Sequence, residues 1–251
     1  MKKIVILLFL LFPIAVYGQI SGRSPKGQVD RDTLNKLAQQ VKSDPANADA
    51  HTKFINYLGI DSDELVKQYE AWSKEFPACA MVPFALGEAY QKVESPRARP
   101  WLLKAVAIDP KLSKAYFYLW IDGERWGDFN ASREFLRLAM ESDPSSPDYA
   151  FYYRSGFKNS DPERYKKGMY EMPKLFPGHE RGAQALYWLG LFVKDTKERL
   201  SVYQYLKENY PPSKSNWSSS GMYDYYYLLL ETDAAKAMQL EIGRASCRER
   251  V

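Results

Sequence analysis

The residue types that most often carry chemistry are few in this chain of 251 residues. It has two histidines, His51 and His179, and two cysteines, Cys79 and Cys247. Neither histidine has a His, Cys or carboxylate neighbour at the spacing of a metal site, and neither lies in a recognisable nucleophile motif. The glycines of LGEAY and WLGLF stand singly, unlike those of a phosphate-binding loop. The sequence therefore predicts no catalytic residue, cofactor or metal site, and no enzymatic activity, in residues 19–240.

His51, His179 and Cys79 are expected to have structural roles. A lone histidine is usually a surface or partly packed side chain, and we expect this of His51 in a helix and of His179 in a loop. Cys79 follows Pro77 in the turn FPACAM. A reactive thiol would need exposure and an activating neighbour, so the expectation for Cys79 is a small buried side chain.

The elements that would position any site are marked by prolines. Six of them each follow an amphipathic stretch, at intervals of 32, 33, 34, 33 and 34 residues: Pro45, Pro77, Pro110, Pro144, Pro177 and Pro211. Each marks the end of a helix, because proline cannot continue one and its predecessor avoids helical dihedral angles. A period near 34 residues holds two short helices and two turns, and such pairs must stack to bury both faces. The sequence predicts an all-α, right-handed α-solenoid of antiparallel helix pairs over residues 31–240, with the last repeat truncated.

The best-formed unit is similar to a known repeat. Its first helix reads LGEAY, with Leu86, Gly87 and Tyr90 on one face, and its second helix carries Ala98 and Leu102 on the facing side. Small residues at such positions let two helices approach closely. The Leu-Gly-x-x-Tyr pattern, the alanine of the second helix and the terminal proline together resemble the tetratricopeptide repeat. The resemblance implies stacked helix pairs with a concave groove that binds a protein or peptide.

Several later positions depart from this pattern. Trp120 stands where the family has a small residue, which implies a looser or tilted helix pair. Ser160 is expected to cap a helix together with Glu163, and Pro173 is expected to end or kink that helix early. Leu189 and Gly190 repeat the Leu-Gly pair about three residues later than expected after their proline, so we expect a longer loop around 178–181.

An aromatic stripe provides the candidate binding residues. Phe84, Phe117 and Phe151 lie 33 and 34 residues apart, at the same place in successive first helices. The resemblance puts this place on the groove side, so the peptide-groove candidates are these three residues with Glu88 and Ile121. Packing between neighbouring pairs is the alternative role for the stripe. Glu88 and Ile121 stand where carboxylate-clamp members have asparagines, so a clamp for chaperone tails is not expected.

The two ends of the chain differ from the repeats. Residues 1–18 have the basic start, apolar run and small residue of a signal peptide, and the apolar run is too short to span a bilayer comfortably. Residues 19–30 are expected to be disordered. Residues 242–251 match a translated sequencing adapter in order, so the tail 241–251 is interpreted as non-native. Without the basic and acidic residues of the signal peptide and the tail, 30 basic and 29 acidic residues remain, which gives no support for a nucleic-acid partner.

Three functions are compatible with these features. The first is an exported protein- or peptide-binding scaffold of the bacterial periplasm or cell envelope, with no cofactor and no stable membrane insertion. The second is the N-terminal helical region of an envelope thiol-disulfide oxidoreductase with a thioredoxin-like domain downstream of residue 240, which is an analogy at the level of the fold. The third is an outer-membrane nutrient-uptake accessory.

Overall fold

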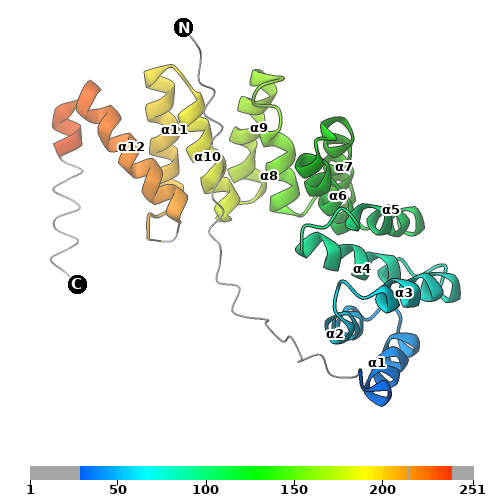
Figure 1. Ribbon diagram of the computed structural model, residues 1–251. Helices are drawn as coiled ribbons and strands as arrows, with labels where there is room; N and C mark the ends of the chain where they lie inside the picture. Colours follow the sequence, from blue (N-terminus) through cyan, green and yellow to red (C-terminus); the bar gives the residue numbers. More distant parts are fainter. Residues whose placement is uncertain (1–28, 214, 239–251) are drawn as a thin grey trace, which may run out of the picture.

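The computed structural model describes residues 29–213 and 215–238, which form an arc of antiparallel helix pairs (Figure 1). The second helices of the pairs, together with α1, are odd-numbered: α1 Arg31–Ser43, α3 Asp63–Glu75, α5 Ala98–Ile108, α7 Phe129–Ser142, α9 Pro162–Leu175 and α11 Thr196–Asn209. The first helices are even-numbered: α2 Ala48–Leu58, α4 Met81–Lys92, α6 Ser113–Trp126, α8 Pro147–Ser155, α10 Glu180–Phe192 and α12 Asn216–Thr232. The predicted signal peptide 1–18, most of segment 19–30 and the tail 241–251 lie outside the described residues.

The proline period is confirmed as the period of the helix pairs. Each of the six prolines lies two residues after the last residue of an odd-numbered helix, as Pro45 follows Ser43 and Pro211 follows Asn209. Figure 1 shows the even-numbered helices from α2 to α10 along the inner side of the arc, with the odd-numbered helices outside them. The described part of the chain contains no strand, and the all-α helical-repeat solenoid predicted from the sequence is the observed fold.

In the second and third pairs, close contact depends on a glycine that has no side chain. A Cβ atom on Gly87 of α4 would lie 2.9 Å from the side chain of Leu102 on α5, and one on Gly123 of α6 would lie 2.7 Å from Cβ of Ser132 on α7. The predicted role of Gly87 is therefore confirmed. The looser pair expected from Trp120 is wrong, because α6 and α7 approach each other at Gly123, one helical turn further along.

Three local expectations are corrected. The cap of α9 is Asp161, whose carboxylate accepts from the backbone N–H of Arg164 at 3.0 Å, and not Ser160. The α9 helix runs through Pro173 to Leu175, since a proline in the last turn costs few backbone hydrogen bonds and its buried ring packs in the core. The loop before α10 is short, because α10 begins at Glu180 and Leu189 and Gly190 lie near its C-terminal end instead of near its middle.

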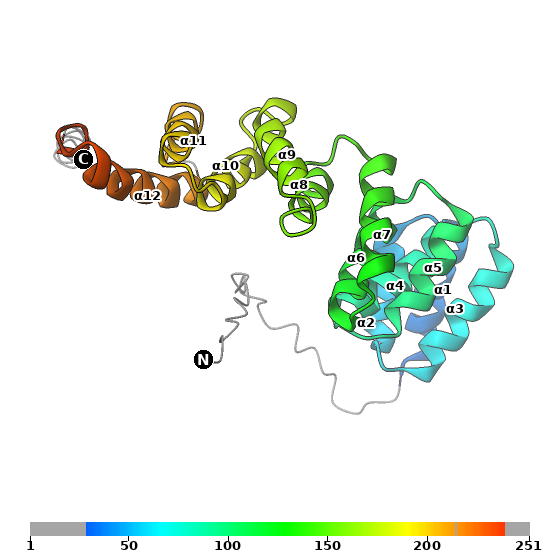
Figure 2. The same ribbon diagram turned by 90° about the horizontal axis from the view of Figure 1, so that it is seen from above.

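The hydrophobic interior is divided into two clusters. One runs from Leu34 to Ala139 within α1–α7, and the other from Ala150 to Ala237, mostly within α8–α12. Figure 2 shows the same division, with α1–α7 grouped at one end of the arc and α8–α12 at the other. We refer to these as the N-terminal block and the C-terminal block. Among the helices of the described residues, none is long and apolar enough to cross a membrane.

Candidate functional site

Aromatic rings of neighbouring even-numbered helices contact one another from α4 to α12. We call this set the inner aromatic row, and its members are Phe84, Phe117, Tyr118, Trp120, Tyr149, Phe151, Tyr152, Tyr187, Trp188 and Trp217. Each contact between neighbouring inner helices joins one helix pair to the next. The ring contacts run from Phe117 of α6 through Tyr152, Phe151 and Trp188 to Trp217 of α12, and Phe84 and Tyr118 add a ring pair between α4 and α6.

The ring distances show how the row passes between pairs. Phe84 of α4 stacks with Tyr118 of α6, with ring centroids 6.2 Å apart. Phe151 of α8 lies 5.1 Å from Trp188 of α10, and Trp188 lies 6.3 Å from Trp217 of α12. Aromatic pairs at these distances add stability beyond the area that they bury. The same rings therefore contribute to the stacking of the pairs.

The row crosses from the N-terminal block to the C-terminal block at α6 and α8. The ring of Phe117 lies 4.9 Å from that of Tyr149 and 5.9 Å from that of Tyr152, and Trp120 lies 4.9 Å from Tyr152. Phe117, Trp120, Tyr149 and Tyr152 are each half-buried. These four half-buried rings lie together where the two blocks meet.

The predicted aromatic stripe occupies buried and half-buried positions. Phe151 is 0% exposed and Phe84 is 4% exposed, while Phe117 is half-buried. Phe84 and Phe151 therefore fill space between neighbouring pairs, as the packing alternative expects. Ile121 is half-buried on α6. The part that these residues take in ligand binding stays a prediction.

The groove candidates drawn from the sequence did not include the tyrosines that follow Phe117 and Phe151. Tyr118 comes directly after Phe117 and Tyr152 directly after Phe151, and both tyrosines are half-buried. Half-buried tyrosines present ring area and a hydroxyl group at low conformational cost, as at protein interfaces. The signal was present in the sequence as a second aromatic residue directly after Phe117 and Phe151, although Phe84 has no such neighbour.

Glu88 is held by groups from the next pair. Its carboxylate lies 2.7 Å from Nζ of Lys114 and accepts a hydrogen bond from the hydroxyl of Tyr118 at 2.9 Å. Burial alone would raise the pKa of Glu88, but Lys114 and Tyr118 outweigh it and hold the pKa below its usual value. Lys92 adds a longer ion pair at 3.6 Å. Glu88 is therefore a charged, already paired group.

Arg181 makes the corresponding link between α8 and α10. Its Nε donates to the Asp148 carboxylate at 2.6 Å, and its Nη2 donates to the Tyr152 hydroxyl at 3.2 Å. The guanidinium also lies over the rings of Phe151 and Tyr152, 5.2 and 4.9 Å from their centroids. Burial would lower the pKa of Arg181, but Asp148 and Tyr152 outweigh it and raise the pKa. This arginine is therefore neutralised by the chain itself.

The histidines and the cysteine take structural positions, and one expectation is corrected. His51 is fully buried, and not at the surface as expected. Burial is tolerated because both ring nitrogens have hydrogen-bond partners, the Tyr69 hydroxyl and the Pro45 carbonyl. His179 is exposed and caps α10, accepting from the backbone N–H of Arg181 at 3.1 Å. Cys79 is half-buried, and its Sγ donates to the Pro45 carbonyl at 3.2 Å. No group of three His, Cys, Asp or Glu that could hold a metal occurs within residues 29–213 and 215–238.

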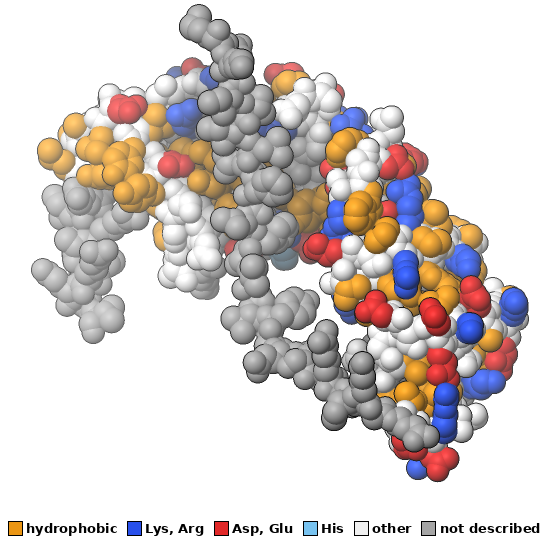
Figure 3. Space-filling model, in the orientation of Figure 1, with side chains coloured by type: hydrophobic (Ala, Val, Ile, Leu, Met, Phe, Trp, Pro, Cys, Tyr) orange, Lys and Arg blue, Asp and Glu red, His pale blue; other side chains and the backbone are white. Residues whose placement is uncertain are grey.

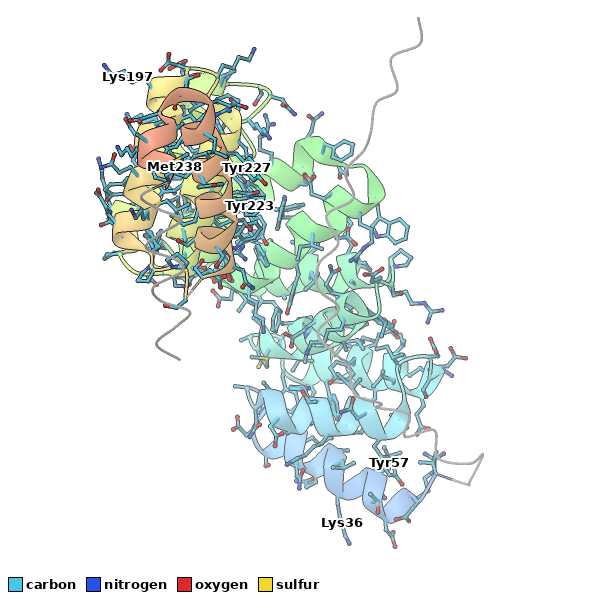
Figure 4. The ribbon with its side chains drawn as sticks, turned by 90° about the vertical axis from the view of Figure 1, so that its left-hand side faces the viewer. Lys36, Tyr57, Lys197, Tyr223, Tyr227 and Met238 are labelled. Atoms are coloured by element: carbon cyan, nitrogen blue, oxygen red, sulfur yellow. The ribbon has the colours of Figure 1, made fainter. Side chains whose placement is uncertain are left out.

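The end of the array at α12 presents an exposed apolar face. Tyr223 and Tyr227 lie one turn apart with ring centroids at 4.9 Å, and both are about half exposed (Figure 4). Leu230 and Met238 are also exposed beyond them. Hydrophobic side chains gather over this end in Figure 3.

The chain was compared with known proteins. No protein-family model matches it, and neither does any curated protein. Among solved structures, one similar structure is that of a MamA protein, with a TM-score of 0.50 and 14% sequence identity. The match covers 71% of this chain and 90% of the MamA chain. A second MamA structure has a TM-score of 0.48 at 19% identity and covers 59% and 85%. YrrB, described as a TPR protein with an unusual peptide-binding site, has a TM-score of 0.47 at 14% identity and covers 84% and 99%.

Structural similarity at such low sequence identity shows only that the fold is similar. It agrees with the helix pairs, the proline after each second helix and the close contact at Gly87. These features are the ones for which the sequence resembles the tetratricopeptide repeat. In its fold, the chain is a tetratricopeptide-like helical-repeat protein.

Proposed function

We propose that this protein is a binding scaffold whose inner face holds a peptide or protein segment with apolar side chains. The observation that supports it is the inner aromatic row, which includes rings from the five even-numbered helices α4, α6, α8, α10 and α12. Half-buried tyrosine and tryptophan rings are favoured at protein interfaces because they offer a large contact area with few rotatable bonds. The row gives a solenoid of this fold an extended apolar surface to offer a ligand.

The charges of the inner face favour an apolar ligand over an acidic one. Lys114 is paired with Glu88, and Arg181 is paired with Asp148. An acidic tail would have to compete with these carboxylates for the same cations. The expectation that a carboxylate clamp is absent, drawn from Glu88 and Ile121, agrees with this charge pattern.

The ligand contact is centred on α6 and α8. Phe117, Trp120, Tyr149 and Tyr152 form the half-buried group there, with ring contacts between 4.9 and 5.9 Å. Binding energy at interfaces is concentrated in a few such aromatic residues. We take Trp120 as the side chain whose loss weakens binding most, because it is the largest of the four.

Export to the periplasm or cell envelope is part of the proposal. It rests on the signal-peptide pattern of residues 1–18, which lie outside the described residues. N-terminal sequencing of the mature protein from a bacterial host checks it. A mature chain that begins near Gln19 supports export, and a retained Met1 in the cytoplasmic fraction contradicts it.

The test of binding uses the full chain and a random peptide library displayed on phage. The selected peptide with the highest affinity is synthesised, and its Kd is measured by fluorescence anisotropy. Trp120→Ala is compared with Trp126→Ala, a matched control in the same helix whose ring is 53% exposed and lies outside the row. Circular dichroism establishes that both variants keep their helices.

The expected result is a difference between the two tryptophans. Trp120→Ala should weaken the peptide by at least about tenfold, while Trp126→Ala leaves Kd within about twofold. Equal effects of the two substitutions on a folded protein would refute the inner face as the binding surface. Failure of the library to yield any peptide that binds the wild-type chain would also count against the proposal.

A further inference from the structure

A cavity of about 240 Å³ lies at the junction of the two blocks, between α7, α8 and α9. Its apolar lining comes from Met140 of α7, Tyr153 of α8 and Phe157, which follows α8. None of these residues belongs to the inner aromatic row. The cavity is smaller than most pockets for drug-sized ligands, so it has room for a small molecule or for the end of a larger one.

The charged lining of this cavity is predominantly basic. Arg154, Arg164 and Lys167 face a single acidic residue, Glu171. The Arg154–Glu171 ion pair is long, at 3.8 Å, and neither Arg164 nor Lys167 has a carboxylate within 4.0 Å among the described residues. The lining therefore carries a net charge of +2 before any ligand binds.

Arg154 is the most deeply placed of these cations. Its stem packs across α9 at Gly168, where an added Cβ would lie 3.0 Å from Cγ and 3.1 Å from Cβ of the arginine. Its Nη1 donates to the carbonyl of Ala150 at 3.3 Å. Burial lowers the pKa of Arg154, although Glu171 favours the charged form. A largely buried guanidinium with only a distant carboxylate is a site that an anion would stabilise.

Arg164 contacts the aromatic side chains of the cavity lining. Its guanidinium lies 3.8 Å from the centroid of the Phe157 ring, and its Nη2 donates to the Tyr153 hydroxyl at 3.0 Å. The stacking fixes the orientation of the guanidinium against the ring. Cations and an aromatic surface therefore line the same small volume.

We propose that this cavity binds a carboxylate carried on a small apolar or aromatic body. The carboxylate would lie between Arg154 and Lys167, and the apolar body against Met140 and Phe157. The apolar wall at Met140 and Phe157 favours a carboxylate with an apolar body over inorganic phosphate, because phosphate would leave this wall without a partner. A free organic acid and the C-terminal residue of a peptide share this chemistry.

The experiment titrates phenylacetate into the full chain and follows binding by isothermal calorimetry. Phenylacetamide is the neutral probe of the same shape, and inorganic phosphate is the anion without an apolar body. Lys167→Gln removes one cation of the cavity. Lys174→Gln is the matched control, because Lys174 is an exposed residue of the same helix that does not line the cavity.

Phenylacetate should bind the wild-type chain at least about tenfold more tightly than phenylacetamide or phosphate does. Lys167→Gln should weaken phenylacetate by about fivefold or more, with no change for Lys174→Gln or for the inner-row variant Trp120→Ala. No binding of phenylacetate to the wild-type chain, equal binding of phosphate, or equal effects of the two lysine substitutions would each overturn the proposal.

Two further probes separate the sources of the carboxylate. N-acetylphenylalanine carries the carboxylate of a peptide C-terminus, and its primary amide lacks it. Binding of N-acetylphenylalanine at least as tight as that of phenylacetate, and lost in the amide, supports a peptide C-terminus as ligand. Binding of phenylacetate alone supports a free organic acid.

A second variant tests the site by adding a side chain that displaces Arg154. Gly168→Val would push the stem of Arg154 out of its present position, since the space at Gly168 is already filled by that stem. Phenylacetate binding should be lost in this variant while the helical circular dichroism is kept. Retained binding in the folded variant would contradict the assigned position of the carboxylate.

Discussion

The hydroxyl of Tyr69 lies 2.8 Å from Nδ1 of His51 in the buried interior of the first helix pair. On the other side of the ring, Nε2 lies 3.0 Å from the carbonyl oxygen of Pro45. A carbonyl can only accept, so Nε2 carries the proton and Nδ1 accepts from Tyr69. The first of the period-marking prolines is thus tied to the following pair by a neutral histidine.

This arrangement predicts a loss of stability in acid. Burial lowers the pKa of His51, although the Pro45 carbonyl and Asp44 favour the charged form. The unfolded chain therefore takes up the proton first, and the free energy of unfolding should decrease as the pH falls below about 6.5, by up to about 1.4 kcal/mol per pH unit. Urea unfolding at about pH 7.5 and about pH 5 measures it. His51→Gln should lose less stability between these two values, and an equal loss in both proteins would contradict the assignment.

A methyl group at Gly123 should destabilise the third pair. The added Cβ would lie 2.7 Å from Cβ and 3.2 Å from Cα of Ser132, and the backbone cannot move away cheaply. Gly123→Ala should lower the free energy of unfolding by about 1–3 kcal/mol. The control is Gly156→Ala, whose added Cβ would meet nothing closer than 3.5 Å. Equal urea midpoints for the two variants would show that the close contact at Gly123 does not limit packing.

Arg99 should stabilise the turn between α6 and α7 by neutralising a buried acid. Its Nη1 lies 3.3 Å from the Asp122 carboxylate, which is 1% exposed, and its Nη2 pairs with Asp128. Removing one partner of a buried pair leaves an uncompensated charge, so Arg99→Gln should cost about 2–3 kcal/mol near neutral pH. Arg97→Gln, an exposed change at the start of the same helix, is the control.

The cost of Arg99→Gln should depend on pH in a defined direction. Burial raises the pKa of Asp122 even though Arg99 favours the charged form, and removing Arg99 raises it further. An acid whose pKa is raised in the folded protein contributes stability at low pH, where it is protonated. This contribution is lost as the pH rises through the pKa that the acid has in the folded protein. The deficit of the variant should therefore shrink toward about pH 4, and adding Asp122→Asn should recover part of it near neutrality. A deficit that is constant over this range would contradict the role of Asp122.

Phe151 should behave as a core residue. Its ring is 0% exposed between α8 and α10, so Phe151→Ala should lower the free energy of unfolding by about 3–5 kcal/mol. Phe129→Ala, at a position that is 62% exposed, is the matched control and should change stability little. Thermal unfolding followed by circular dichroism compares them. A Phe151→Ala protein as stable as the control would assign the ring to the surface.

The repeat architecture could be predicted from the sequence because its signals are local and periodic. Pro45 and its five equivalents act through their own backbone geometry, and Gly87 acts through a contact within one helix pair. Such signals do not depend on distant parts of the chain. The same is true of the Leu-Gly pattern, whose buried side is read directly from helical spacing.

The candidate site could be predicted only in part, because it depends on contacts between pairs. The spacing of Phe84, Phe117 and Phe151 marked one place in successive first helices, but it did not decide between the groove side and packing against the neighbouring pair. His51 gave no sign of burial, since its partners Tyr69 and Pro45 come from other segments. Asp161 displaced Ser160 as the cap of α9 because the two residues compete for the same helix end and a shift of one residue decides between them.

The separation of the interior into two clusters has a mechanical consequence. Each block is a densely packed body that resists deformation, whereas the junction between Ala139 and Ala150 is crossed by half-buried rings and by a basic cavity. We therefore expect any bending of the arc to concentrate at this junction. A ligand bound to Phe117, Trp120, Tyr149 and Tyr152 would contact both blocks and would stiffen the arc there.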